Sequence, residues 1–160
     1  MKIIEVLVLE QEKGLFLEIS RKLPLVKVEG SPFQTFRLEI DPELLMYFYL
    51  FDSSAIIPTD FKEDILPHLK RILIVSGDVS FRKWNFSEEV ALFLEQYQKK
   101  IPTVTVLATE EGKRKQRPAV LFETGLYLGK NSRLFNWERG NEENLSRVWS
   151  TFWSDLQLPI

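Results

Sequence analysis

The stretch that decides the fold is FRLEIDPELLMYFYLF, residues 36–51. Its first five residues alternate between apolar and charged side chains, which predicts a strand with one face in water. Asp41 and Pro42 then provide the residues of a turn. The almost continuous apolar run at residues 44–51 is typical of a central strand buried on both faces. Residues 36–51 are therefore predicted to form an antiparallel hairpin.

Outside this hairpin, strand patterns alternate with helix patterns. Further strands are predicted at residues 3–9, 71–76, 101–107 and 133–137. Helices are predicted at residues 15–23, 60–69, 87–97, 119–126 and 142–156. This alternation predicts an α/β fold, a three-layer sandwich with a mostly parallel sheet plus one antiparallel hairpin strand. With no linker and no internal repeat, residues 1–160 are expected to form a single domain.

Two of these helices carry features that predict their ends and buried faces. Ser87 is a predicted N-cap, and the acidic residues that follow it suit the first turn of a helix. The apolar stripe of that helix is predicted to consist of Val90, Leu92, Phe93 and Tyr97. The apolar face of the last helix is predicted to consist of Leu145, Val148, Trp149, Phe152 and Trp153. Both stripes are expected to pack on the sheet.

Composition excludes several classes of function. The formal net charge of -2 gives no overall attraction to nucleic acid, and the basic run at residues 113–117 is interpreted as a solvated loop. The chain has no cysteine and one histidine, His68, so no dense metal site is expected. No apolar run approaches the length of a membrane span, and no signal peptide is recognisable. We therefore expect a cytoplasmic protein without metal or cofactor, and without enzymatic activity.

The loop after the first strand, LEQEKGLF at residues 9–16, occupies a position where phosphate-binding loops occur. The pattern of such loops is G-x-x-x-x-G-K-[ST]. If Gly14 is the second glycine, then Leu9 stands at the first glycine, Leu15 at the lysine and Phe16 at the hydroxyl residue. Only Lys13 brings a positive charge to this loop. The position is that of a phosphate loop, but most of the required side chains are missing.

The order of elements resembles that of Ras-like small GTPases, and the hairpin is similar to that of the MglA-like GTPases of bacterial gliding motility. In that branch, a strand of the type Tyr49-Leu50-Phe51 leads directly into a T-P-G-Q switch motif. Here the strand is followed by Asp52, Ser53, Ser54, Ala55 and Ile56, with Ala55 and Ile56 in place of the glycine and glutamine. The guanine-selecting N-K-x-D motif is replaced by Ala108, Thr109, Glu110 and Glu111. The resemblance therefore implies a degenerate GTPase.

A triphosphate with Mg²⁺ needs backbone amides, a lysine and a hydroxyl ligand, so we expect a pseudo-GTPase that binds no nucleotide. Its implied role is protein binding, with a roadblock-fold protein or a motility or polarity protein as the partner, or with a second copy of itself. Large apolar residues near the two switch segments are candidates for this surface: Phe33, Phe36, Ile56, Ile57 and Phe61. They could equally fill the vacated nucleotide pocket, and the sequence leaves both interpretations open.

Two other functions are compatible with the same layout. A divergent nucleotide hydrolase could use Lys13 and the backbone amides near Gly14 as unrecognised phosphate contacts. A degenerate receiver-like signalling domain could use Glu10, Glu12 and Asp52 as its acidic residues and Lys113 as its lysine. The early hairpin argues against the receiver, because receiver-like domains have a parallel sheet.

Overall fold

The structure is a computed structural model that describes residues 1–77, 87–109 and 132–155, and the side chains up to residue 153. The strands are β1 (Lys2–Glu10), β2 (Val26–Lys27), β3 (Thr35–Asp41), β4 (Leu44–Asp52), β5 (Leu69–Gly77), β6 (Thr103–Thr109) and β7 (Ser132–Glu138). The helices are α1 (Leu15–Ile19), α2 (Thr59–Asp64), the short 3₁₀ helix η1 (Leu66–His68), α4 (Glu88–Tyr97) and α6 (Glu142–Asp155). The predicted helix at residues 119–126 and the basic run at residues 113–117 lie outside the described residues.

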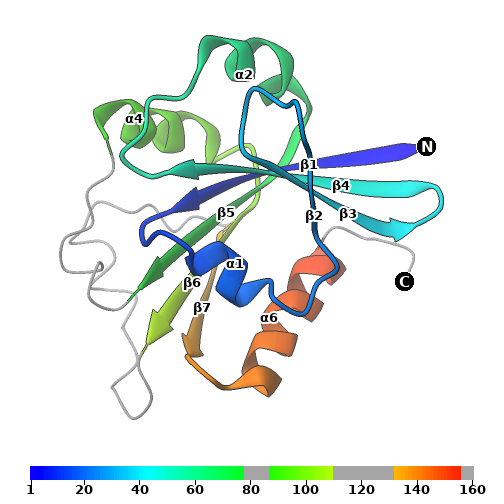
Figure 1. The fold of residues 1–160 in the computed structure, drawn as a ribbon. Coiled ribbons are helices and arrows are strands. Elements are labelled where there is room, and N and C mark those ends of the chain that lie inside the picture. Colours follow the sequence, from blue (N-terminus) through cyan, green and yellow to red (C-terminus); the bar gives the residue numbers. More distant parts are fainter. Residues whose placement is uncertain (78–86, 110–131, 156–160) are drawn as a thin grey trace.

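The strands form one sheet in the order β2-β3-β4-β1-β5-β6-β7 (Figure 1). The predicted hairpin is confirmed, since β3 pairs antiparallel with β4 and places Phe36 opposite Phe48. From β4 onward every pairing is parallel. The predicted α/β fold with a mostly parallel sheet is therefore confirmed. The two-residue strand β2, which pairs with β3, was not predicted because it is too short to show a periodicity.

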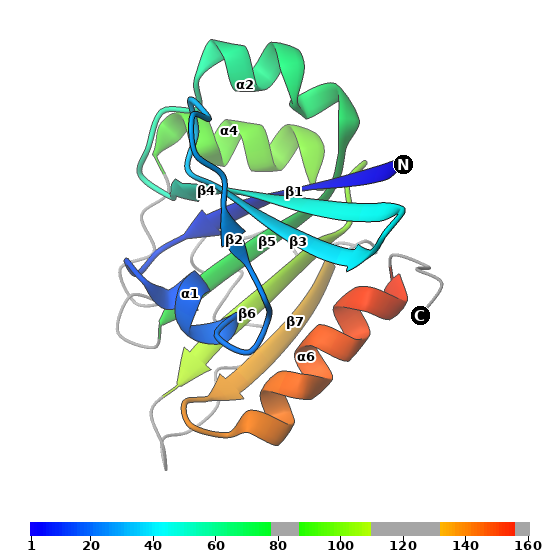
Figure 2. The same cartoon turned by 45° about the vertical axis from the view of Figure 1, so that its right-hand side comes forward.

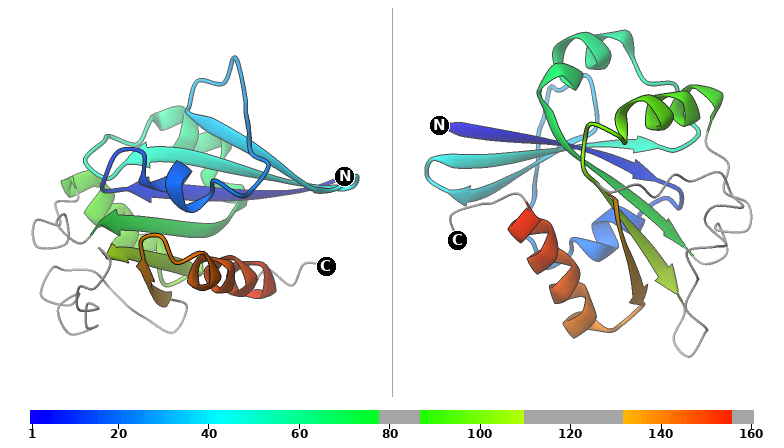
Figure 3. Two further views of the ribbon diagram at one scale, coloured as in Figure 1. Left: turned by 60° about the horizontal axis from the view of Figure 1, so that its bottom comes forward. Right: turned by 180° about the vertical axis from the view of Figure 1, so that it is seen from behind.

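Helices cover both faces of this sheet (Figures 1 and 2). Helices α2 and α4 lie on one face, while α1 and α6 lie on the other, as the view from behind also shows (Figure 3). Because side chains alternate along a strand, Val6 and Val8 of β1 pack toward α1 and α6, whereas Leu7 and Leu9 pack toward α2 and α4. The central position of β1 between two apolar layers explains why its sequence is apolar at nearly every position.

The Ser87 cap is confirmed, because its hydroxyl accepts a hydrogen bond from the backbone N–H of Val90 at 3.1 Å. The predicted stripe of α4 was wrong at one position: Leu92 is 59% exposed, and Leu94 is buried instead. Leu94 lies four residues after Val90 and so shares its face of the helix, whereas Leu92 lies two residues after it and does not.

Helix α1 is shorter than predicted, since it ends at Ile19 and not near residue 23. The hydroxyl of Ser20 donates to the carbonyl of Phe16 at 2.6 Å, and this contact competes with continuation of the helix.

Helix α6 has the predicted face, with Leu145, Val148 and Phe152 buried in the core. In the described part of the chain, no helix is both long and apolar enough to cross a membrane.

Candidate functional site

The candidate site is the loop between β1 and α1, at the carboxyl ends of the central strands. Gly14 has a φ of 89° and forms the N-cap of α1, a left-handed conformation that glycine adopts without strain. The carboxylate of Glu10 lies inside the loop: Oε1 accepts from the N–H of Gly14 at 3.1 Å and Oε2 from the N–H of Phe16 at 2.8 Å. These amides belong to the kind of backbone concavity that binds phosphate in other proteins. Here they bind a carboxylate of the same chain.

Glu10 is almost completely buried, and this burial raises the pKa of its carboxyl group above the ordinary value. The hydrogen bonds from Phe16 and Gly14 act in the opposite direction, and the negative charges of Asp52 and Glu12 add to the increase. The acidic environment of this loop is thus unfavourable for further negative charge.

Glu10→Gln is expected to change how stability depends on pH. A carboxyl whose pKa is raised by folding holds its proton more tightly in the folded state, so the wild-type protein should lose stability as the pH rises above 4.5, the pKa of an unperturbed glutamate. The variant has no ionisable group at position 10, so it should not lose stability in this way. As the pH rises, its free energy of unfolding should therefore increase relative to that of the wild type. Urea denaturation at several pH values measures the difference, with Glu43→Gln at an exposed site as the control. A difference that stays constant with pH would contradict the raised pKa.

The two residues at the lysine and hydroxyl positions are part of the hydrophobic core. Leu15 and Phe16 are both completely buried, and the ring of Phe16 contacts those of Phe48 and Phe36, with centroids 5.4 and 6.0 Å away. Leu9, at the position of the first glycine, is also buried, whereas Lys13 is exposed. The start of α1 is therefore held in place by apolar packing against the hairpin.

An ion pair crosses the site from the loop after β7. Nη2 of Arg139 lies 2.5 Å from Oε2 of Glu12, and the backbone N–H of Arg139 donates to the carbonyl of Thr109 at 2.8 Å. Gly77 at the end of β5 lies against this pair, since a Cβ there would lie 2.8 Å from Oε1 of Glu12 and would require the Glu12 side chain to shift. Sequence reasoning missed Arg139 and Gly77, because Arg139 lies 127 residues after Glu12 and no local motif marks either residue.

The guanine-selecting position falls at the end of β6. Ala108 and Thr109 are buried there, and the hydroxyl of Thr109 donates to the carbonyl of Trp137 at 3.4 Å. Thr109 is therefore engaged with the neighbouring strand β7. Glu110 and Glu111, the other two residues of this prediction, lie outside the described part of the chain.

The segment after β4, at the position of the switch motif, is held by hydrogen bonds at both ends. The Asp52 carboxylate accepts from the backbone N–H of Ser54 at 2.8 Å, and the carbonyl of Asp52 accepts from the N–H of Ala55 at 2.9 Å. Ser87 then attaches the segment to α4: its N–H donates to the carbonyl of Ser53 at 3.1 Å, and its hydroxyl donates to the carbonyl of Ala55 at 3.0 Å. These hydrogen bonds connect the turn to β4 and to the start of α4.

Of the five apolar candidates for a protein-binding surface, three are buried: Phe36, Ile57 and Phe61. Phe36 belongs to the core on the α1 and α6 face of the sheet, while Ile57 and Phe61, a residue of α2, belong to the core on the opposite face. Phe33 is partly buried against Phe61, with ring centroids 5.5 Å apart. In this conformation, core packing makes Phe36, Ile57 and Phe61 inaccessible to a partner. Ile56 alone of the five is largely exposed, at 76%.

Within residues 1–77, 87–109 and 132–155, no group of three or more His, Cys, Asp or Glu side chains could hold a metal ion. His68 is exposed at the end of η1.

Comparison with known proteins adds evidence from structure alone. No protein-family model matches the chain, and no curated protein matches its sequence. Among solved structures, it is similar to an ADP-ribosylation-factor-like GTP-binding protein, the small COPII coat GTPase SAR1 of Encephalitozoon cuniculi in complex with GDP. The identity is 12%, the match covers 97% of this chain and 83% of that chain, and the TM-score is 0.60.

Weaker similarities are found to two other nucleotide-binding domains. For the Arl6 BBS3 small GTPase of Trypanosoma brucei, the identity is 9%, the coverage 94% of this chain and 97% of that one, and the TM-score 0.49. For the FeoB G-domain of Methanococcus jannaschii, the identity is 7%, the match covers 95% of this chain and 96% of that one, and the TM-score is 0.49. The sheet order, the antiparallel β3–β4 hairpin and the similarity to SAR1 exclude the receiver-like alternative, whose sheet has the order 2-1-3-4-5. The chain has the fold of the small P-loop GTPases.

Proposed function

We propose that this protein is a pseudo-GTPase, a small-GTPase fold that binds no guanine nucleotide and acts by binding another protein. The observation that carries the first part is the position of the Glu10 carboxylate, which accepts hydrogen bonds from the amides of Gly14 and Phe16. A nucleotide phosphate would need those same amides. Glu10 therefore competes with any phosphate from within the chain.

This competition favours Glu10 for two reasons. A free nucleotide loses translational and rotational freedom on binding, at a cost of about 4 kcal/mol or more, whereas Glu10 is already attached beside the loop. A phosphate that entered while Glu10 remained charged would also be repelled, whereas the charge of Glu12 is paired with Arg139. At 4 Å, a pair of like charges costs about 1 kcal/mol in water and about 4 kcal/mol at an effective dielectric constant of 20.

The two loop positions that should supply compensating groups do not supply them. The positions of the phosphate-binding lysine and the magnesium-binding hydroxyl hold Leu15 and Phe16, which belong to the core. The catalytic glutamine position holds Ile56, whose side chain cannot orient an attacking water. Hydrolysis of GTP is therefore not expected even at high nucleotide concentration.

The purified protein is expected to contain no nucleotide and to show no thermal stabilisation by GTP or GDP with Mg²⁺. Chromatography of the supernatant after denaturation measures the bound nucleotide, and a melting curve measures stabilisation, since any ligand specific for the native state raises the melting temperature. ATP serves as the comparison nucleotide. Stoichiometric guanine nucleotide, or a melting temperature that rises with GTP concentration, would refute the proposal and favour a divergent hydrolase that uses Lys13.

For the second part of the proposal, the strongest candidate contact is Ile56. It is 76% exposed and directly follows the turn that Asp52 and Ser87 hold in place. An apolar side chain on a fixed backbone loses little conformational entropy on binding, which favours an interface anchor. By the resemblance of the hairpin to that of MglA-like GTPases, the partner would be a roadblock-fold protein or a motility or polarity protein, or a second copy of this chain.

Ile56→Asp is expected to abolish binding of this partner while leaving the fold intact, because the side chain is in solvent. Affinity purification from the source cells, with analytical ultracentrifugation of the purified protein, measures partner capture and self-association. Leu92→Asp is the matched control, since Leu92 is also an exposed apolar residue, at 59%, but lies on α4. If the Ile56 variant recovers the same partners as wild type, the interface lies elsewhere on the molecule.

A further inference from the structure

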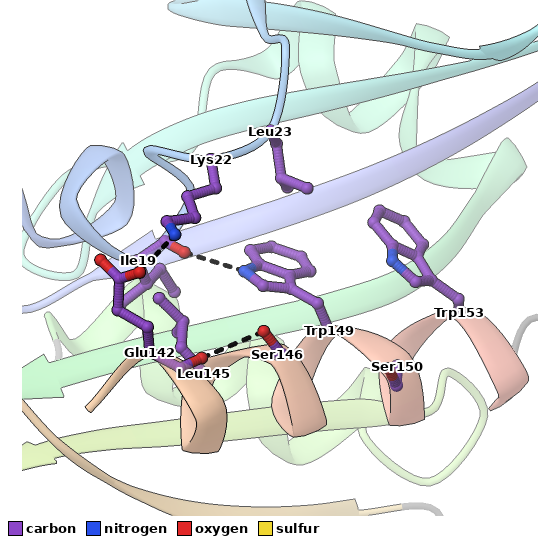
Figure 4. Close-up of a pocket in the computed structure, with 9 residues that line it drawn as sticks. All are labelled: Ile19, Lys22, Leu23, Glu142, Leu145, Ser146, Trp149, Ser150 and Trp153. Carbon is purple, nitrogen blue, oxygen red and sulfur yellow. Dashed lines mark hydrogen bonds and ion pairs between the residues drawn. The ribbon is translucent and has the colours of Figure 1, made fainter.

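A groove runs between the turn that follows α1 and the exposed side of α6 (Figure 4). It is open to solvent and has a volume of about 190 Å³. Its walls come from Ile19, Lys22 and Leu23 on one side and from residues of α6 on the other. It contains none of the residues of the β1–α1 loop or of the segment around Ile56. It is therefore separate both from the loop that holds the Glu10 carboxylate and from the proposed protein-binding surface.

The inner part of the groove is apolar. Trp149 lines it but is only 7% exposed, and its indole N–H donates to the carbonyl of Ile19 at 2.8 Å, so it presents no free donor to the groove (Figure 4). Trp153 stacks beside it, with ring centroids 5.5 Å apart and planes 22° from parallel. Leu23 lies across the hollow from these two rings (Figure 4). A planar apolar group would contact ring faces here without leaving a polar group unpaired.

Lys22 and Glu142 line one end of the groove. Arg21, which is not part of the lining, also pairs with the Glu142 carboxylate, so these three side chains together carry a net charge of +1. The hydrogen bond from Lys22 lowers the pKa of Glu142, which is therefore ionised at neutral pH. An ammonium group has three N–H donors, and Lys22 is 66% exposed, so it can bind a second carboxylate.

From this arrangement we infer that the groove is a binding site for a small aromatic monocarboxylate. The ring lies between Leu23 and the indoles of Trp149 and Trp153, and the carboxylate lies at Lys22. The size of the cavity, room for about six water molecules at roughly 30 Å³ each, suits a single ring with a short chain.

The test uses 3-phenylpropionate as the ligand, with two matched compounds: its neutral amide and the saturated 3-cyclohexylpropionate. The indole N–H signals in a proton–nitrogen NMR spectrum report binding, since the chain has four tryptophans. Trp137 is the internal reference, because it is buried and its N–H donates to the carbonyl of Asn141 at 3.1 Å. We expect the signals of Trp149 and Trp153 to shift, with a dissociation constant of about 1 mM for a ligand of this size. The amide should bind about fivefold more weakly because it lacks the charge.

Two variants locate the site. Lys22→Gln should reduce the affinity for the acid to that of the amide, and Lys100→Gln, at an exposed position after α4 that does not line the groove, should have no effect. Ser150→Phe should abolish binding of all three compounds, because Ser150 lines the cavity and is exposed, so a ring there fills the hollow without disturbing the core.

Three results would overturn the inference. The first is the absence of shifts at Trp149 and Trp153 at ligand concentrations up to about 20 mM, well above the expected dissociation constant. The second is equal affinity for 3-phenylpropionate and one of its matched compounds. Equal affinity for the amide would show that the charge plays no role, and equal affinity for 3-cyclohexylpropionate would show that the aromatic ring plays none. The third is unchanged binding by Ser150→Phe, which would place the ligand outside the groove.

Discussion

Replacing Leu15 with Lys and Phe16 with Thr, which restores the two missing side chains of a phosphate loop, is expected to unfold the protein and not to create a nucleotide site. Both wild-type residues are fully buried, and Phe16 packs against Phe36 and Phe48. Truncation of a buried Phe costs about 3–5 kcal/mol, and a buried unpaired ammonium group adds several more. Together these losses approach the total stability of an ordinary domain, about 5–15 kcal/mol.

Urea denaturation followed by circular dichroism measures this effect. Leu17→Lys is the matched control, because Leu17 lies on the same helix but is 45% exposed, and such a surface change is expected to alter stability by about 0.5 kcal/mol at most. A double variant that remains folded and binds GTP would show that the loop can still open into a phosphate site. That result would also contradict the role assigned to Glu10.

Phe61→Ala is expected to destabilise the protein by about 3–5 kcal/mol and to loosen α2 in particular. Phe61 is fully buried, and its ring meets those of Phe51, Tyr49 and Phe33 edge to face, with centroids 5.1, 5.5 and 5.5 Å away. Aromatic pairs of this kind contribute about 0.5–1.5 kcal/mol each beyond the burial of their area. The cluster joins α2 to β4 and to the loop before β3.

Amide hydrogen exchange measures the local effect, since the amides of residues 59–64 should lose protection more than those of the central strands. Ile56→Ala is the control within the same segment, because Ile56 is exposed and its truncation should change stability by roughly 0.5 kcal/mol or less. If Phe61→Ala leaves the exchange of α2 unchanged, the aromatic cluster does not hold this segment in place.

The sequence by itself determined the architecture. The alternation at residues 36–40, the apolar run at 44–51 and the cap at Ser87 predicted elements that the structure confirms. These features are local, since they depend on the period of a strand or helix and on one hydrogen bond within a turn. The absence of a lysine and a hydroxyl at positions 15 and 16 was also visible in the sequence.

Only the tertiary structure decided what occupies the loop and which apolar residues remain accessible. Glu10 enters the cradle of amides because Gly14 takes a left-handed conformation, and no pattern in the sequence distinguishes this carboxylate from that of Glu12. Ile56 and Ile57 are identical neighbours, yet one is 76% exposed and the other is buried under α2. Arg139 reaches Glu12 across 127 residues. Each outcome depends on how distant segments meet in the folded chain, which local periodicity does not encode.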